Sequence, residues 1–114
     1  MPATLHKEER LSGKTAISTL VSKGHWGSTP HVKYCVFEGN GLEFNRILVS
    51  VPKKFFKRAV KRNLLKRRMR EAYRTQKELL EVTGRDIMFV WSSPETSPYG
   101  TVREEIAKIL ASVK

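Results

Sequence analysis

The strongest constraint on this chain is a short basic segment. Lys53 to Arg74 holds 11 of the 22 Lys and Arg residues, opposed within that segment only by Glu71. The chain of 114 residues has a formal net charge of +11, so nearly all of its excess charge is local. Like charges at this density repel one another and attract a polyanion, with an affinity that depends strongly on salt. Any fold must therefore leave most of these side chains facing outward.

The basic segment also has the apolar spacing of an amphipathic helix. At about 100° per residue, one face collects Asn63, Arg67, Arg70 and Arg74, and the far face collects Leu65, Met69, Ala72, Leu79 and Leu80. Neither Gly nor Pro occurs from Lys53 to Thr83, which predicts a long helix of about 25 residues that stops at Gly84. We expect its apolar face to dock on the core and its basic face to point outward.

Length and composition define the frame around this helix. With 114 residues, 39% of them hydrophobic, the chain suits a single domain spanning residues 1–114. It has no apolar run long enough to span a bilayer, and its start lacks the apolar stretch of a secretory signal, so we expect a cytoplasmic protein without membrane contacts. Cys35 is the single cysteine, cannot form an internal disulfide, and is predicted to lie in the core.

Hydrophobic periodicity outlines the remaining elements. Thr15 to Lys23 and Thr101 to Val113 have helical spacing. His31 to Phe37 and Leu42 to Val51 are rich in strand-forming residues and flank an Asn-Gly pair, which predicts a hairpin. Asp86 to Trp91 reads as an interior strand.

These elements follow the order α, β, β, α, β, α, which predicts an α+β fold. We expect a small mixed sheet with helices packed on it, with room for one further short strand. The basic helix links two strands, and a link between parallel strands usually crosses right-handed.

Side chains suited to catalysis are scarce. Asp86 is the only aspartate, and the three histidines have no metal-ligand spacing. Glu104 and Glu105 are adjacent but would point in different directions from a helix, so we interpret them as solvated charges near its start. The sequence therefore argues against an autonomous enzyme and predicts neither a catalytic residue nor a metal ligand.

The charge pattern favours binding of a polyanion. A solvated helix normally mixes signs through i,i+4 pairs, whereas Lys57 to Arg74 offers nine Lys and Arg against a single acid. Neither helix-turn-helix nor zinc-module spacing is present, which argues against sequence-specific DNA reading. Binding to anionic membranes is disfavoured because the apolar side of the helix is needed for the core.

The residues from Arg46 to Lys54 and from Lys57 to Arg74 resemble the bacterial ribonuclease P protein family. Four pairs stand at the offsets of that family's signature: Ala59-Val60, Arg62-Asn63, Lys66-Arg67 and Arg70-Glu71. Weaker similarity extends to Arg10-Leu11, to Lys23-Gly24, to residues 84–87 and to the closing helix, so it covers nearly the whole chain.

This resemblance implies an accessory subunit of ribonuclease P that is inactive on its own. The RNA subunit, with Mg²⁺, would cleave precursor tRNA to produce the mature 5′ end. The protein would bind the ribonuclease P RNA and the 5′ leader of precursor tRNA, need no obligate protein partner, and contain a left-handed β-α-β crossover. The alternative is a general RNA-binding or ribosome-associated protein without an enzymatic partner.

The resemblance also indicates residues that bind the RNA subunit. Its motif falls on Lys53, Lys54, Arg62, Asn63, Lys66, Arg67 and Arg70, and charge alone adds Lys57, Lys61 and Arg74. Asn63 can both donate and accept hydrogen bonds on a crowded basic face, unless it proves buried and capped. Leu64 replaces a residue that is usually basic in the family, so one RNA contact is expected to be missing.

A second set of residues is expected to form the cleft for the leader: Ile17, Val21, Tyr34 and Arg46. Ile17 and Val21 occupy positions that are often aromatic in the family, and aliphatic contact would replace only part of the base stacking. Tyr34 is the nearest aromatic candidate. Phe37 and Phe44 are expected in the core.

Overall fold

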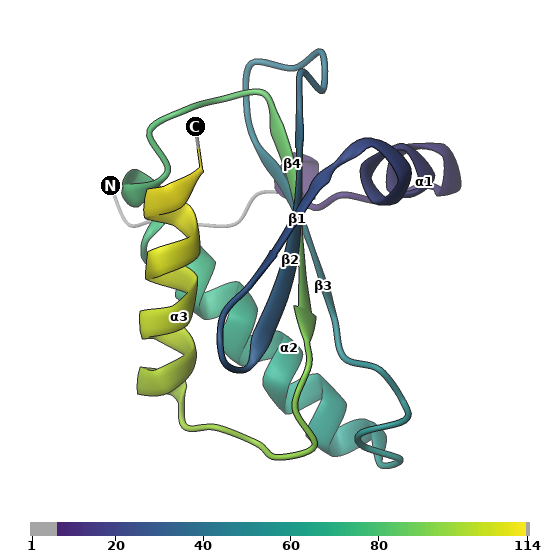
Figure 1. The fold of residues 1–114 in the computed structure, drawn as a ribbon, viewed down its shortest axis with the longest axis vertical. Coiled ribbons are helices and arrows are strands. Elements are labelled where there is room, and N and C mark those ends of the chain that lie inside the picture. Colours follow the sequence, from purple (N-terminus) through teal and green to yellow (C-terminus); the bar gives the residue numbers. More distant parts are fainter. Residues whose placement is uncertain (1–6, 114) are drawn as a thin grey trace.

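The computed structural model describes residues 7–113 as a four-stranded sheet with α2 and α3 on one face and α1 on the other (Figure 1). Residues 1–6, which include most of the start compared above with a secretory signal, and residue 114 lie outside the described part. In chain order the elements are η1 (Lys7–Glu9), α1 (Lys14–Lys23), β1 (His25–Ser28), β2 (Val32–Glu38), β3 (Arg46–Ser50), α2 (Ala59–Arg74), η2 (Lys77–Leu79), β4 (Arg85–Trp91) and α3 (Tyr99–Ser112). The predicted α+β class is confirmed, and β1 is the further short strand.

The strand order β1-β2-β4-β3 shows that the predicted hairpin is wrong. β2 pairs antiparallel with β1 and β4, and β3 pairs parallel with β4, so β4 separates the two strands that the Asn-Gly turn was expected to join. β4 takes the interior place, as predicted, because most of its residues are buried. The observed hairpin joins β1 to β2, where the N–H of Thr29 donates to the carbonyl of Val32 at 2.7 Å. α2 connects the parallel neighbours β3 and β4, and the left hand of this crossover stays a prediction.

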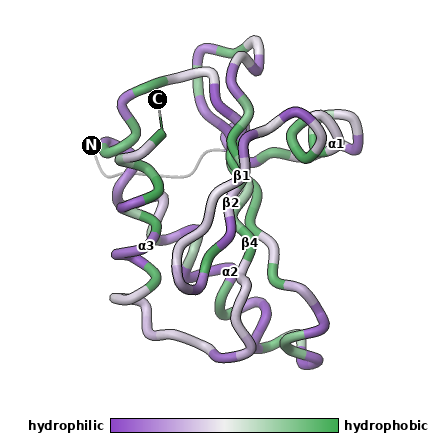
Figure 2. Tube along the Cα trace, viewed as in Figure 1, coloured by the Kyte–Doolittle hydropathy of each residue, from purple (hydrophilic) through white to green (hydrophobic). Residues whose placement is uncertain are grey.

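Alternation along the strands divides the core into two layers. The larger cluster lies between the sheet and the α2–α3 layer and includes Leu65, Phe89 and Ile106, each fully buried. The smaller one lies under α1 and contains Leu11, Leu20, Cys35 and Met88. Figure 2 shows the central strands as largely hydrophobic, whereas α2 mixes hydrophilic and hydrophobic residues. The predicted burial of Cys35 is confirmed.

α2 is shorter than the predicted helix of about 25 residues, since it ends at Arg74. The cause is Gln76, which is buried and breaks the regular pattern with its own side chain. Its amide donates to the carbonyl of Ala72 at 2.9 Å and to the carbonyl of Arg103 at 3.0 Å, while its N–H turns to Tyr73. At its other end α2 begins at Ala59, so the irregular segment before the helix contains Lys53, Lys54 and Lys57.

A buried ion pair fixes the start of β4 to β3. Asp86 is 2% exposed and accepts two hydrogen bonds from the Arg46 guanidinium, at 2.9 Å to Oδ1 and 2.7 Å to Oδ2. The side-chain amide of Asn40 adds a third at 2.9 Å. The hydrogen bonds from Arg46 to Asp86 raise the pKa of Arg46. The only aspartate of the chain is thus a structural residue.

A second buried carboxylate, Glu105, ties α3 to the β1–β2 turn, so the interpretation of Glu105 as a solvated charge is wrong. Its Oε1 accepts hydrogen bonds from the Thr29 hydroxyl at 2.5 Å and the His31 N–H at 2.8 Å, and its Oε2 lies 2.7 Å from the His31 Nδ1. The His31 ring stacks on Trp91 with centroids 5.7 Å apart. Burial alone would raise the pKa of the Glu105 carboxyl, but these hydrogen bonds lower it below its ordinary value.

Replacing Asp86 with Ala leaves the Arg46 guanidinium and the Asn40 amide without their shared acceptor. We expect the free energy of unfolding to fall by about 3 kcal/mol, because removing one member of a buried pair leaves an uncompensated charge. Urea unfolding followed by circular dichroism measures this loss. Glu38→Ala, an exposed acid at the end of β2, is the control, and an equal loss in both variants would contradict the role given to Asp86.

Replacing Glu105 with Gln should lower the free energy of unfolding by about 1–2 kcal/mol at neutral pH. A carboxyl with a lowered pKa in the folded state stabilises the fold above its unfolded pKa, and this contribution is lost as the pH falls through the folded value. The gap between wild type and variant should therefore narrow as the pH drops below 4.5, the ordinary value. Urea titrations at several pH values test this, with exposed Glu104→Gln as the control. A gap that does not change with pH would refute the ionised role.

Candidate nucleic-acid interface

The interface is built on the side of α2 that faces away from the core. Leu65, Met69, Ala72 and Tyr73 are buried, which leaves the opposite side of the helix at the surface. With 3.6 residues per turn, that side carries Asn63, Arg67 and Arg74. The orientation predicted from periodicity is confirmed for the helical part, whereas Leu79 lies beyond the helix and is 39% exposed.

The ten residues expected to bind the RNA subunit all lie on α2 or in the segment just before it. Six are exposed: Lys53, Lys54, Lys57, Lys61, Asn63 and Arg67. Four are half-buried: Arg62, Lys66, Arg70 and Arg74. The exposure of Asn63 rules out the alternative in which this residue is buried and capped. Val60 is 78% exposed and adds an apolar side chain to this charged surface, which the charge pattern did not reveal.

Arg62 also shapes the segment that precedes α2. Its Nη1 donates to the carbonyls of Phe56 at 2.7 Å and Lys57 at 2.8 Å. These bonds fix the turn into the helix, which has no side-chain N-cap. Just before it, the Lys54 ammonium lies 5.0 Å from the centre of the Phe55 ring, and Phe55 packs against the main core. These contacts position the Lys54 side chain and the backbone at Lys57.

Like Arg62, two more arginines of α2 are engaged within the chain, namely Arg68 and Arg74. Arg74 forms a two-point ion pair with Glu71, with Nε at 3.0 Å from Oε1 and Nη2 at 2.7 Å from Oε2. Hydrogen bonding within this pair raises the pKa of Arg74 and lowers that of Glu71. Arg68, which was not predicted as a site residue, donates to the carbonyl of Ser97 at 2.5 Å. Glu71 thus offsets the charge of Arg74, whereas Arg68, which donates to a neutral carbonyl, keeps its positive charge.

The four residues expected in the leader cleft do not come together. Tyr34 packs against the main core on the α2–α3 face, whereas Ile17 packs against the smaller cluster under α1, and exposed Val21 lies on α1 as well. Successive side chains of a strand point to opposite faces, and Tyr34 has the same parity as buried Val32. The placement of Tyr34 in this cleft is therefore wrong. Arg46 is already paired with Asp86.

The aromatic residue that β2 presents to the α1 face is Phe37. It is half-buried and packs beside Leu48 and Val90 against the cluster under α1. The expectation of a core position is met only in part for Phe37 and is wrong for Phe44, which is 37% exposed. This face therefore keeps an aromatic and aliphatic surface without Tyr34.

Trp26 extends the same surface and was missed because β1 was not predicted. Its register partner is Cys35, so both side chains point to the α1 face. Trp26 is 45% exposed, and the Lys33 Nζ lies 5.3 Å from the centre of its ring. An exposed indole next to a cation can stack on a nucleobase and attract its phosphate.

The described residues contain neither a membrane-spanning helix nor a cluster of metal-binding side chains. Among residues 7–113, none of the helices combines the length and apolar character needed to cross a bilayer. Within the same range, no three His, Cys, Asp or Glu side chains are grouped so that they could hold a metal ion.

Comparison with known proteins identifies the family. The family model described as Ribonuclease P matches residues 5–114. The ribonuclease P protein component of Porphyromonas gingivalis is 37% identical over 98% of this chain and 89% of the relative. The solved ribonuclease P protein of Thermotoga maritima has a TM-score of 0.81 and 26% identity, covering 93% of this chain and 98% of that one. The protein from Staphylococcus aureus, at 21% identity, covers 90% of this chain and 92% of its own with a TM-score of 0.78, and supports the fold alone. The chain therefore belongs to the ribonuclease P protein family.

Proposed function

We propose that this protein is the protein component of ribonuclease P and acts in maturation of the tRNA 5′ end. The observation that carries the proposal is the basic side of α2, which the fold presents at the surface. The family match supports this role over that of a general RNA-binding protein. The protein binds the ribonuclease P RNA and, within the holoenzyme, the precursor tRNA.

The RNA subunit is held by α2 and by the lysines before it. The planar guanidinium of exposed Arg67 can donate two parallel hydrogen bonds to one phosphate, and Asn63 beside it can donate or accept. Lys53 and Lys54 add point charges whose counterions are released on binding. The affinity should accordingly fall steeply with salt.

The single-stranded 5′ leader is held by the α1 face of the sheet. Phe37 and Trp26 offer aromatic surfaces there, and Lys33 supplies a positive charge beside Trp26. Stacking of one base on an aromatic side chain contributes about 1–3 kcal/mol and depends little on base identity. Ile17 contributes apolar contact with the leader, but its aliphatic side chain cannot stack on a base as an aromatic ring would.

Cleavage is assigned to the RNA subunit, where Mg²⁺ would supply charge stabilisation at the reacting phosphate. Within residues 7–113, no three His, Cys, Asp or Glu side chains are grouped so that they could hold a metal ion, and the proposal assigns the ion to the RNA. The protein contributes by binding and orienting the substrate strand, which lowers the entropic cost of reaching the reactive arrangement.

Adding the purified protein to a bacterial ribonuclease P RNA at low Mg²⁺ should restore cleavage of precursor tRNA at the mature 5′ end, because bound cations offset repulsion between the two RNAs. Gel analysis of a 5′-labelled precursor measures this, and the protein without RNA subunit is the control. Cleavage by the protein alone would contradict the assignment of chemistry to RNA. RNA binding that leaves cleavage unchanged would favour a general RNA-binding protein.

Neighbouring residues of α2 should separate binding from stability. Asn63→Ala should weaken binding of the RNA subunit about fivefold and leave the free energy of unfolding within about 0.5 kcal/mol, because Asn63 is exposed. Arg62→Ala should weaken binding and also lower the free energy of unfolding by about 1 kcal/mol, since two carbonyls lose their donor.

Filter binding and urea unfolding provide the two measurements for this pair. Lys108→Ala, an exposed position on α3, is the matched control and should change neither quantity appreciably. A stability loss in Asn63→Ala equal to that in Arg62→Ala would show that Asn63 has a structural role instead.

A further inference from the structure

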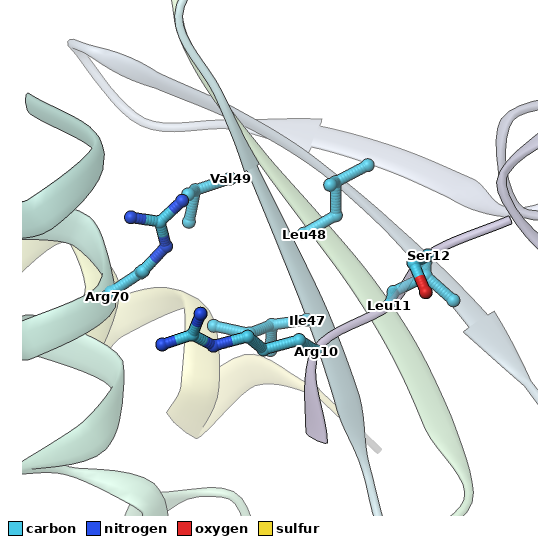
Figure 3. A pocket seen from close by; sticks show the side chains of 7 residues that line it. All are labelled: Arg10, Leu11, Ser12, Ile47, Leu48, Val49 and Arg70. Atoms are coloured by element: carbon cyan, nitrogen blue, oxygen red, sulfur yellow. The ribbon is translucent and has the colours of Figure 1, made fainter. Parts of the chain in front are cut away.

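Two arginines from distant parts of the chain meet at the outer edge of β3. Arg10, just before α1, and Arg70, on α2, line a pocket of about 240 Å³. Figure 3 shows both guanidinium groups reaching into the space beside Ile47 and Val49. Leu11, Ser12 and Leu48 complete the lining.

No carboxylate among the described residues forms an ion pair with either arginine. The acids next to them in sequence are occupied elsewhere: Glu9 binds Lys77 at 2.7 Å, and Glu71 binds Arg74 at 2.7 Å. Burial and the charge of Arg10 both lower the pKa of Arg70. The fold thus holds two like charges together without a counter-charge, an arrangement that an anion would stabilise.

The backbone of β3 adds a donor to this pocket. The N–H of Leu11 donates to the carbonyl of Ile47 at 2.7 Å, so the polar groups of Ile47 point to the outer edge of the sheet. Polar groups of alternate strand residues point to the same side, and those of Val49 therefore face the same edge. The guanidinium groups of Arg10 and Arg70 and the backbone N–H of Val49 are all donors. Together they suit an oxyanion with several acceptor oxygens.

We propose that the pocket between Arg10 and Arg70 binds one phosphodiester of the ribonuclease P RNA. This inference rests on the proposed function. Arg70 lies one helical turn after Lys66, so the pocket adjoins the basic side of α2. In the proposed complex, neighbouring phosphates of the same RNA strand contact the basic side of α2. Arg10 thereby becomes an RNA-binding residue although it lies outside the basic segment.

The test uses Arg10→Gln, Arg70→Gln, the double variant and a matched control, Lys108→Gln, which also removes one positive charge. Affinity for the ribonuclease P RNA is measured at several salt concentrations. Each single variant should bind about fivefold to tenfold more weakly and lose about one unit of salt slope. Because both arginines serve one phosphate, the double variant should also lose only about one unit, and its loss of affinity should be smaller than the product of the two single losses.

A second arm measures the melting temperature against inorganic phosphate. Wild type and Lys108→Gln should be stabilised by phosphate, and Arg10→Gln and Arg70→Gln much less. Melting without added anion also shows that the variants fold, and removal of one like charge should leave them at least as stable as wild type.

Three results would overturn the proposal. If Arg10→Gln and Arg70→Gln bind the RNA as well as Lys108→Gln does, the pocket is not part of the RNA interface. If these two variants also lose the stabilisation by inorganic phosphate, the pocket is a site for a free anion. A double variant that loses two units of slope would indicate two separate phosphates. Wild type that fails to bind the RNA would refute the proposed function itself, a failure distinct from one seen only in the variants.

Discussion

Docking of α2 on the sheet is the interaction on which the rest of the structure depends. Leu65 and Met69 are completely buried, and burial of a side chain of this size contributes about 1.5–3 kcal/mol. This contact fixes the rotation of the helix about its axis. The cations of α2 must then lie at the surface or on its flanks, where they repel one another, so the packing of the core sustains a charge density that the helix alone would not tolerate.

Acidic residues are used to hold the fold together and only sparingly to neutralise α2. Asp86 joins β3 to β4, Glu105 joins α3 to the β1–β2 turn, and Glu9 pairs with Lys77. Glu71 is the one acid within the basic helix, and it is paired with Arg74. The carboxylates therefore stabilise the fold at places away from most of the basic face, which stays available for a polyanion. The function proposed here is a consequence of where the acids are, as much as of where the arginines are.

The sequence predicted those parts that local periodicity determines. α1, α3, β4 and the outward face of α2 agree with the spacing of apolar residues. The prediction of a hairpin between β2 and β3 was wrong because the Asn-Gly pair is a local signal. The pairing of β2 depends on β4, which lies far along the chain. The predicted end of α2 was wrong because the side-chain amide of Gln76 takes the place of a backbone donor to the carbonyl of Ala72. No Gly or Pro in the sequence marks this helix end. On β2, the side chain of Tyr34 points to the α2–α3 face and that of Phe37 to the α1 face. The sequence does not show which face of β2 meets α1, so it could not choose between these two aromatic residues.

The most direct test of the account is to map which side of the protein touches RNA. Cys35 is fully buried and burial raises the pKa of its thiol, so a cysteine introduced at an exposed position can be labelled selectively. An iron chelate attached to Asn63→Cys on α2, or to Lys108→Cys on α3, cleaves nearby RNA strands by generating hydroxyl radicals. In the complex with ribonuclease P RNA, the α2 probe should cut the RNA at discrete sites and the α3 probe should not. Cleavage directed from α3 alone would contradict the claim that the basic side of α2 is the RNA-binding surface.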